Sequence, residues 1–196
     1  FMPEAVNYVK LYFPMFMLGA VFGKVMEETG LAKSIALYLV NTLGKERGIL
    51  SIVLSSVILT YGGVSLFVVV FAVYPFASAL FKEAEIPKRL IPGTIALGAF
   101  TATMDSFPFT PQIQNVIPMP FFGTTTAAAP ILGTIGGCAI LGLGYFYLNS
   151  RVNVARKNGE GYGIHSTNEP TGDELDKNQK LIPFWLSVVP LISVLL

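Results

Sequence analysis

The chain alternates between long apolar stretches without charge and short segments that carry nearly all of its charged residues. Uncharged apolar runs of about 18 residues or more are typical of membrane-spanning helices. We identify such spans at about 9–25 and 124–148, and the start of a further span at 181–196. The sequence therefore predicts an all-α, multi-spanning membrane protein.

One apolar segment is too short to cross a bilayer. It covers residues 31–43, follows a polar step at 24–30, and itself carries Lys33, Ser34 and Asn41. A helix of this length reaches only part of the way across a hydrocarbon core of about 30 Å. We expect it to lie at the membrane interface.

The stretch Ile49 to Phe81 is uncharged over 33 residues, nearly twice the length that one crossing needs. Tyr61-Gly62-Gly63-Val64-Ser65 lies at its middle, and adjacent glycines are poor helix formers. One interpretation is a single long tilted helix, and the other is a helical hairpin whose tip lies within the membrane. The lengths of the two halves favour a re-entrant hairpin over 49–81.

The next apolar segment, residues 90–118, is interrupted after Met104. Pro108 and Pro111 prevent a continuous helix there, and Pro118 ends any short helix that follows. We therefore predict a crossing that is unwound near its middle. With the hairpin and the spans on either side, it completes a transport repeat over residues 1–150.

The positions of the charges support the hairpin. Hydrophobic residues make up 53% of the chain and charged residues 13%, about half the share that soluble domains carry. With a hairpin, the segments 24–47, 82–89 and 151–180 face one side, and they hold 12 of the 13 Lys and Arg residues. A single crossing at 49–81 would place 82–89 on the opposite side. The positive-inside rule then makes all three segments cytoplasmic, with 151–180 as a loop.

The two interruptions are the candidate binding site. Broken helices present free N–H groups and a positive dipole end to an anionic solute. The candidate substrate-binding residues are Gly62, Gly63, Ser65, Thr110, Gln112, Gln114 and Asn115. No Lys or Arg lies at membrane depth, so dipoles and neutral hydrogen bonds would bind the anion. The alternative is that both interruptions are kinks filled by neighbouring side chains.

Asp105 is the single acid inside the predicted membrane region, which makes it a candidate proton carrier. The alternative is a carboxylate near the outer mouth that is either hydrated or bonded to Ser106. The lone Cys138 excludes a disulfide within the chain. Gly133 and Gly137 have the G-x-x-x-G spacing of close helix packing.

The sequence contains no constellation of catalytic or metal-binding residues and no phosphate-binding Gly-Lys-Ser/Thr motif. We therefore expect a protein that is not an enzyme and that uses no cofactor. Nucleic acid is not an expected partner.

Several runs resemble the gluconate:proton symporter (GntP) family of bacterial permeases. They lie within about 48–137, and the most specific is Thr110-Pro111-Gln112-Ile113-Gln114-Asn115. The others are Leu59-Thr60-Tyr61-Gly62-Gly63-Val64-Ser65-Leu66-Phe67-Val68, Tyr74-Pro75, Leu90-Ile91-Pro92, Ile95-Ala96-Leu97-Gly98, Phe122-Gly123-Thr124 and Ala129-Pro130. Where Phe109 stands, the resemblance leads us to expect glycine or another small residue.

The resemblance implies membership of the ion transporter superfamily, with two inverted repeats, elevator-like transport and usually a homodimer. Members have roughly twice this length, so the chain would be the N-terminal half or less. We expect a proton symporter that imports gluconate or a related small hydroxy-carboxylate across the bacterial inner membrane. The alternatives are a sodium-coupled dicarboxylate or citrate carrier, for which we expect more side-chain oxygens at the tip, and a channel or structural membrane subunit.

Overall fold

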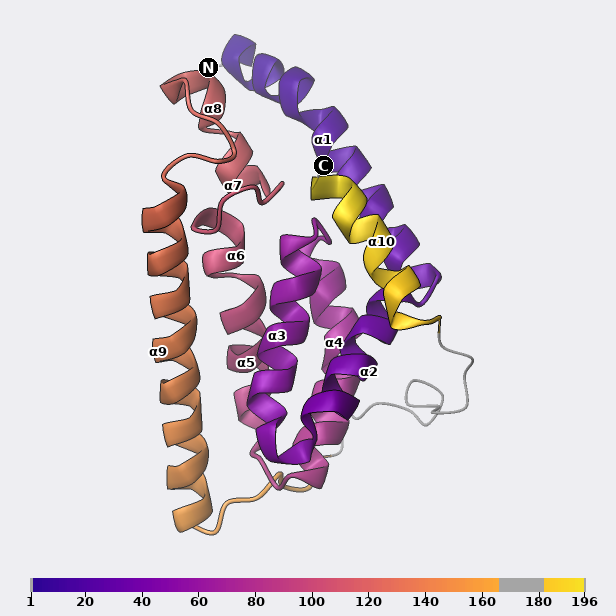
Figure 1. Ribbon diagram of the computed structural model, residues 1–196, viewed down its shortest axis with the longest axis vertical. Coiled ribbons are helices and arrows are strands. Elements are labelled where there is room, and N and C mark those ends of the chain that lie inside the picture. Colours follow the sequence, from indigo (N-terminus) through magenta and orange to yellow (C-terminus); the bar gives the residue numbers. More distant parts are fainter. Residues whose placement is uncertain (1, 166–181, 196) are drawn as a thin grey trace.

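The computed structural model describes residues 2–165 and 182–195, and every regular element in these two ranges is a helix (Figure 1). Within these two ranges, three helices are long and apolar enough to cross a membrane, judged by length and composition. They are α1 (Met2–Glu28), α4 (Leu66–Glu83) and α9 (Pro130–Lys157). The prediction of an all-α membrane fold is confirmed.

The segment predicted as a hairpin forms two antiparallel helices, α3 (Gly48–Tyr61) and α4, joined by residues 62–65 (Figure 1). Gly63 has a φ of +89°, a conformation that glycine adopts without strain. Its N–H donates to Thr60 O at 3.0 Å, and Val64 N–H donates to Leu59 O at 3.1 Å. These two bonds form a Schellman motif, which ends α3 and turns the chain back into α4.

Helix α3 is the centre of the packing, with α2 (Leu31–Leu43), α4 and α5 (Ile91–Ala99) around it. Its serines are buried without loss of hydrogen bonds, because Ser55 Oγ donates to Ser51 O at 2.8 Å and Ser56 Oγ donates to Ile52 O at 2.9 Å. Gly98 allows α5 to lie directly on α3: a Cβ at this position would stand 2.5 Å from Val53 O. Helix α5 is thereby held against the hairpin.

Helix α2 (Leu31–Leu43) has the bounds predicted for the interfacial helix, but it packs lengthwise on α3 and α4 through a small apolar face. Helix α1, which precedes α2, passes beside the hairpin tip, since a Cβ on Gly23 would stand 3.5 Å from Ser65 Cβ. The C-terminal end of α2 leads through η1 (Lys45–Arg47) to the base of the hairpin. Its position at a membrane surface stays a prediction.

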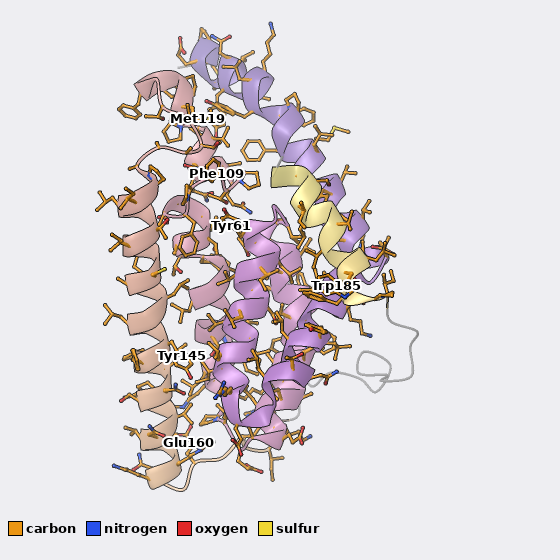
Figure 2. All side chains as sticks on the ribbon, in the orientation of Figure 1. Tyr61, Phe109, Met119, Tyr145, Glu160 and Trp185 are labelled. Carbon is orange, nitrogen blue, oxygen red and sulfur yellow. The ribbon has the colours of Figure 1, made fainter. Side chains whose placement is uncertain are left out.

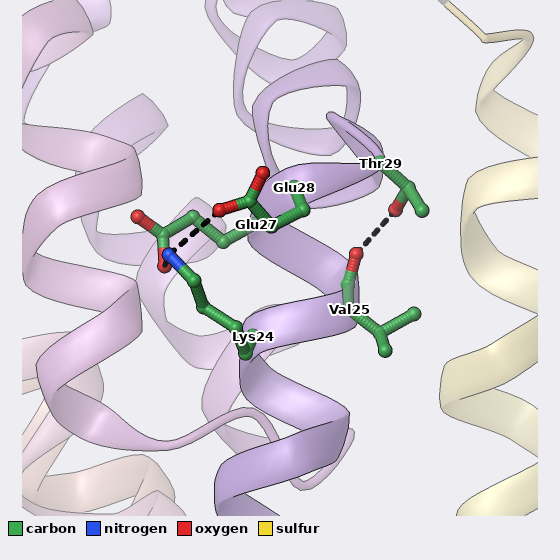
Figure 3. A network of polar contacts seen from close by, with 5 residues as sticks. All are labelled: Lys24, Val25, Glu27, Glu28 and Thr29. Atoms are coloured by element: carbon green, nitrogen blue, oxygen red, sulfur yellow. Dashed lines mark hydrogen bonds and ion pairs between the residues drawn. The ribbon is translucent and has the colours of Figure 1, made fainter.

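A small ionic cluster follows Gly23 at the C-terminal end of α1 (Figure 3). Lys24 Nζ is 2.8 Å from Glu28 Oε1 and 3.4 Å from Glu27 Oε2, and all three side chains are exposed. The predicted charged segment 24–47 thus extends along the hairpin rather than across one end of it.

The predicted crossing over 90–118 is broken earlier and more often than expected. Helix α5 ends at Ala99, and α6 (Ala102–Asp105) follows after a break at residues 100–101. At this break, Thr101 Oγ1 donates to Leu97 O at 2.6 Å and Thr103 Oγ1 donates to Gly98 O at 2.8 Å. Such bonds offer the backbone an alternative to the helical pattern.

After α6 the chain is irregular until two single-turn helices, α7 (Ile113–Val116) and α8 (Met119–Phe122). Phe109 has a φ of +65°, in the left-handed region that favours glycine. The family resemblance led us to expect glycine or another small residue here, and the backbone at Phe109 has a conformation that glycine adopts easily.

Helix α9 differs from the span predicted at 124–148. It begins at Pro130, whose fixed φ suits the first turn, and it continues to Lys157. The extension holds because Leu148, Val152 and Ala155 recur on one buried face. The first part of the predicted loop 151–180 is therefore helical, and residues 166–180 lie outside the described ranges.

Glycines on α9 allow close packing, as the G-x-x-x-G spacing predicted. A Cβ on Gly137 would lie 2.6 Å from the Phe107 ring, and one on Gly133 would overlap Ser106 O. The single cysteine, Cys138, is exposed on the same helix.

The end of the molecule opposite the hairpin tip carries a second ionic cluster, between the α4–α5 connection and the segment after α9. Arg89 forms a bidentate pair with Glu160, with both N···O distances at 2.7 Å. These hydrogen bonds hold the pKa of the Glu160 carboxyl below its ordinary value and raise the pKa of Arg89. In the same region, the buried hydroxyl of Tyr162 lies 2.6 Å from Ser78 Oγ. The segment after α9 is thus fastened to the base of the hairpin.

Candidate functional site

The hairpin tip and the unwound segment meet directly. Gln112 Nε2 donates to Thr60 O at 2.8 Å, and the Tyr61 hydroxyl donates to Pro108 O at 2.9 Å. The Tyr61 ring also lies edge-on to Phe107, with centroids 6.2 Å apart. Figure 2 shows Tyr61 just below Phe109, at the level where the hairpin ends and the unwound segment begins. The two predicted interruptions therefore form one region of the structure.

Two of the predicted binding residues hold the unwound segment together. Thr110 is buried, and its hydroxyl donates to Thr103 O at 2.9 Å. Asn115 Nδ2 lies within hydrogen-bond distance of two carbonyls, Thr110 O at 3.1 Å and Thr126 O at 3.2 Å. Two of these carbonyls, Thr103 O and Thr110 O, belong to the broken crossing, and irregular backbone at membrane depth requires such partners.

A cavity of about 1020 Å³, the tip cavity, lies between α1, the hairpin tip, the unwound segment and α10 (Phe184–Leu195). Four predicted binding residues line it: Gly63, Ser65, Gln112 and Gln114. The Ser65 hydroxyl and the Gln114 amide form no hydrogen bond with other described residues, so they are open to a ligand.

Ser65 is also the N-cap residue of α4, directly before its first turn. The first turn of a helix leaves amide N–H groups without intrahelical partners, and its dipole favours an anion. The start of α4 therefore brings a positive electrostatic end to the wall of the tip cavity. This arrangement suits a carboxylate in the absence of a cationic side chain.

Gly62 lies elsewhere. A Cβ on Gly62 would stand 2.7 Å from Leu191 Cδ2, so this glycine is covered by α10. It borders a second, smaller cavity of about 420 Å³, which Tyr61, Phe107 and Pro108 also line. Ligand contact at Gly62 stays a prediction and would require Leu191 to move.

Asp105 lines neither cavity. Its side chain is exposed at the end of α6, and Oδ1 accepts a hydrogen bond from Ser106 Oγ at 3.1 Å. This is the contact expected for the alternative of a carboxylate bonded to Ser106. A role in proton coupling stays a prediction.

Sequence reasoning missed two groups that join the halves of the site, the Tyr61 hydroxyl and the Thr60 carbonyl. Tyr61 belongs to the predicted interruption, and a tyrosine beside paired glycines was the available signal. The carbonyl could not have been found, because the bond to Gln112 spans 52 residues of sequence.

Comparisons with known proteins place the chain among transporters. The family model described as GntP family permease matches residues 14–196. The "Uncharacterized transporter YxjC" of Bacillus subtilis (strain 168) is 56% identical over 199 residues, which cover 99% of the chain and 42% of that protein. The chain thus spans less than half the length of this relative. No solved structure matches.

Proposed function

The chain belongs to the GntP family of permeases, and on that premise we propose that it forms the substrate-binding repeat of a proton symporter for gluconate or a related small hydroxy-carboxylate. Its family and its transporter relative mark it as part of a membrane-embedded transporter rather than an enzyme. The observation that carries the proposal is the junction of the hairpin tip with the unwound segment beside the tip cavity.

The chemistry of this junction favours an anion with a small polar group. The carboxylate would lie at the start of α4, where backbone N–H groups and the Ser65 hydroxyl are available. A substrate hydroxyl would pair with the Gln114 amide across the cavity. Three of the predicted residues would affect substrate binding indirectly. The hydrogen bonds of Thr110, Asn115 and Gln112 Nε2 hold the unwound segment in place.

We place the hairpin tip within the membrane, with its base and the Arg89–Glu160 cluster on the cytoplasmic side of the bacterial inner membrane. The excess of Lys and Arg at the base supports this orientation. Proton coupling is assigned to Asp105, the single acid between Glu85 and Glu160. A homodimer of the full-length protein is the expected assembly.

Transport by the full-length protein in liposomes tests the proposal. Labelled gluconate and 3-hydroxybutyrate are offered with an imposed proton gradient, with a sodium gradient, or with neither. We expect accumulation that saturates and that depends on the proton gradient. Accumulation driven by sodium alone would identify a sodium-coupled carrier, and flux that never exceeds equilibrium would identify a channel. A failure to accumulate any carboxylate would refute the proposal.

A further inference from the structure

Helix α10 is anchored at one end and interrupted near the other. Phe184, in its first turn, stacks on Tyr38 of α2, with the ring centroids 4.1 Å apart and the ring planes at 20°. Further along, Pro190 lies inside the helix and has no N–H, so it cannot donate the helical hydrogen bond to Leu186 O. The turn after this proline, residues 191–195, is therefore tied less firmly to the anchored end. We call this turn the lid.

The lid lies on the paired glycines of the hairpin tip, where Figure 1 shows the C-terminal end of α10. A Cβ on Gly62 would stand 2.7 Å from Leu191 Cδ2 and 2.8 Å from Leu191 Cβ, closer than carbon atoms in contact ordinarily lie. A Cβ on Gly63 would stand 3.1 Å from Val194 Cγ1. The N–H groups of both glycines already donate to carbonyls of α3 at 3.0 Å. Gly62 thus provides the space that Leu191 occupies.

The lid has open space on both sides. Leu191 lines the smaller cavity of about 420 Å³, which Gly62 also borders, and Val194 lines the tip cavity, which Gly63 borders. A segment with few packed neighbours opens at a lower free energy than one inside a close-packed core. The contact between Leu191 and Gly62 lies between the two cavities, so movement of the lid away from the tip would join them.

We propose that residues 191–195 leave Gly62 and return to it in each transport cycle, and that this opening joins the two cavities at the hairpin tip. A solute in the tip cavity would then reach the side of the tip formed by Tyr61 and Gly62, which borders the smaller cavity. The two glycines accordingly have different roles, because Gly63 forms the turn and Gly62 receives the lid. The movement of the lid does not depend on which solute is carried, whereas its link to transport rests on the proposed function.

Distances between spin labels test the movement without relying on transport. One label is placed on α9 by Leu132→Cys, and the second is placed either in the lid by Ile192→Cys or before the proline by Val189→Cys. These three side chains are 74%, 52% and 57% exposed, so labels fit at all three positions. The distances are measured by double electron–electron resonance in the full-length protein without its native cysteines, Cys138 included. We expect two distances for the pair that includes the lid and one for the other pair, and equal distributions for the two pairs would overturn the lid.

A reversible disulfide tests whether transport requires the movement. In Gly62→Cys/Leu191→Cys the two Cβ atoms start 2.8 Å apart, and a disulfide holds such atoms about 3.5–4.5 Å apart, so a small shift of α10 admits the bond. We expect oxidation to crosslink the pair and stop uptake of the transported acid, and reduction to restore it. Each single-cysteine variant, treated with the same oxidant, is a control and should keep the uptake that it shows before oxidation.

The outcomes separate the lid from the proposed function. Absence of a crosslink would overturn the seat of Leu191 on Gly62, and uptake that continues in the crosslinked protein would overturn the role of the lid in transport. If the pair of cysteines itself prevents uptake before oxidation, the spin-label distances decide. Failure of the unmodified full-length protein to accumulate any carboxylate would overturn the proposed function, and the spin-label distances would still test the lid.

Discussion

The contact between α5 and α3 positions the start of the unwound segment relative to the hairpin. Adding one methyl group at Gly98 should disrupt this contact. In Gly98→Ala the new Cβ would stand 2.5 Å from Val53 O and 2.6 Å from Ser56 Cβ. Carbon atoms in contact are ordinarily about 3.5–4.0 Å apart, and a backbone carbonyl cannot rotate away as a side chain can. Overpacking of this kind costs about 1–3 kcal/mol, against a gain of up to about 1 kcal/mol from the better helix propensity of alanine.

Gly93→Ala is the matched control, because it makes the same change in the same helix. Its Cβ would meet a single neighbour, Leu148 Cδ2, at 3.7 Å, which is an ordinary contact. Thermal unfolding of the full-length protein in detergent, followed by circular dichroism, compares the two variants. We expect the midpoint of Gly98→Ala to fall, by less for each kcal/mol than the about 2–4 °C of proteins of about 150–250 residues because the full-length protein is larger, and that of Gly93→Ala to stay level or rise. Equal midpoints would refute the proposed packing of α5 on α3.

Three further predictions concern the site and the charged end. Tyr61→Phe removes the hydrogen bond to the unwound segment, worth about 0.5–1.5 kcal/mol, and should raise the substrate concentration for half-maximal uptake several-fold; unchanged uptake would contradict this role. Arg89 holds the pKa of Glu160 below its ordinary value. The pair therefore stabilises the fold at any pH above that ordinary pKa, and this stabilisation is lost as the pH falls through the lowered pKa. A spin label at position 158 should gain mobility as the pH falls below about 4.5, the ordinary pKa of a glutamate, and in Glu160→Gln already at neutral pH; equal mobility throughout would contradict this role of the Arg89–Glu160 pair. Asp105→Asn should abolish accumulation driven by the proton gradient while substrate exchange continues, and full proton-driven uptake would remove this carboxylate from coupling.

The features that the sequence predicted well have a local physical cause. The hairpin follows from two glycines in a long uncharged stretch, and Gly63 occupies the left-handed position that the turn needs. The unwound segment follows in the same way from Pro108 and Pro111. Charge placement then decided between a hairpin and a single crossing, because a crossing would have separated 82–89 from the other basic segments.

What the sequence did not predict depends on contacts between distant segments. The cover over Gly62 comes from Leu191 on α10, far along the chain. The early end of α5 at Ala99 falls inside an uncharged apolar run, so hydropathy alone does not reveal it. The extension of α9 beyond residue 148 depends on a narrow buried face within a polar stretch, and an average over a window hides such a face.

The central claim is that the hairpin tip and the unwound segment bind substrate together, and substrate protection of a cysteine at residue 65 tests it most directly. Ser65→Cys is made in the full-length protein with Cys138→Ala, and the rate of maleimide labelling is measured with and without 3-hydroxybutyrate or gluconate. The cavity wall at the start of α4 predicts that a transported acid slows labelling at position 65. It also predicts that the same acid leaves the labelling of Cys138, which is exposed on α9, unchanged in the parent protein. A labelling rate at position 65 that no transported acid alters would contradict the account.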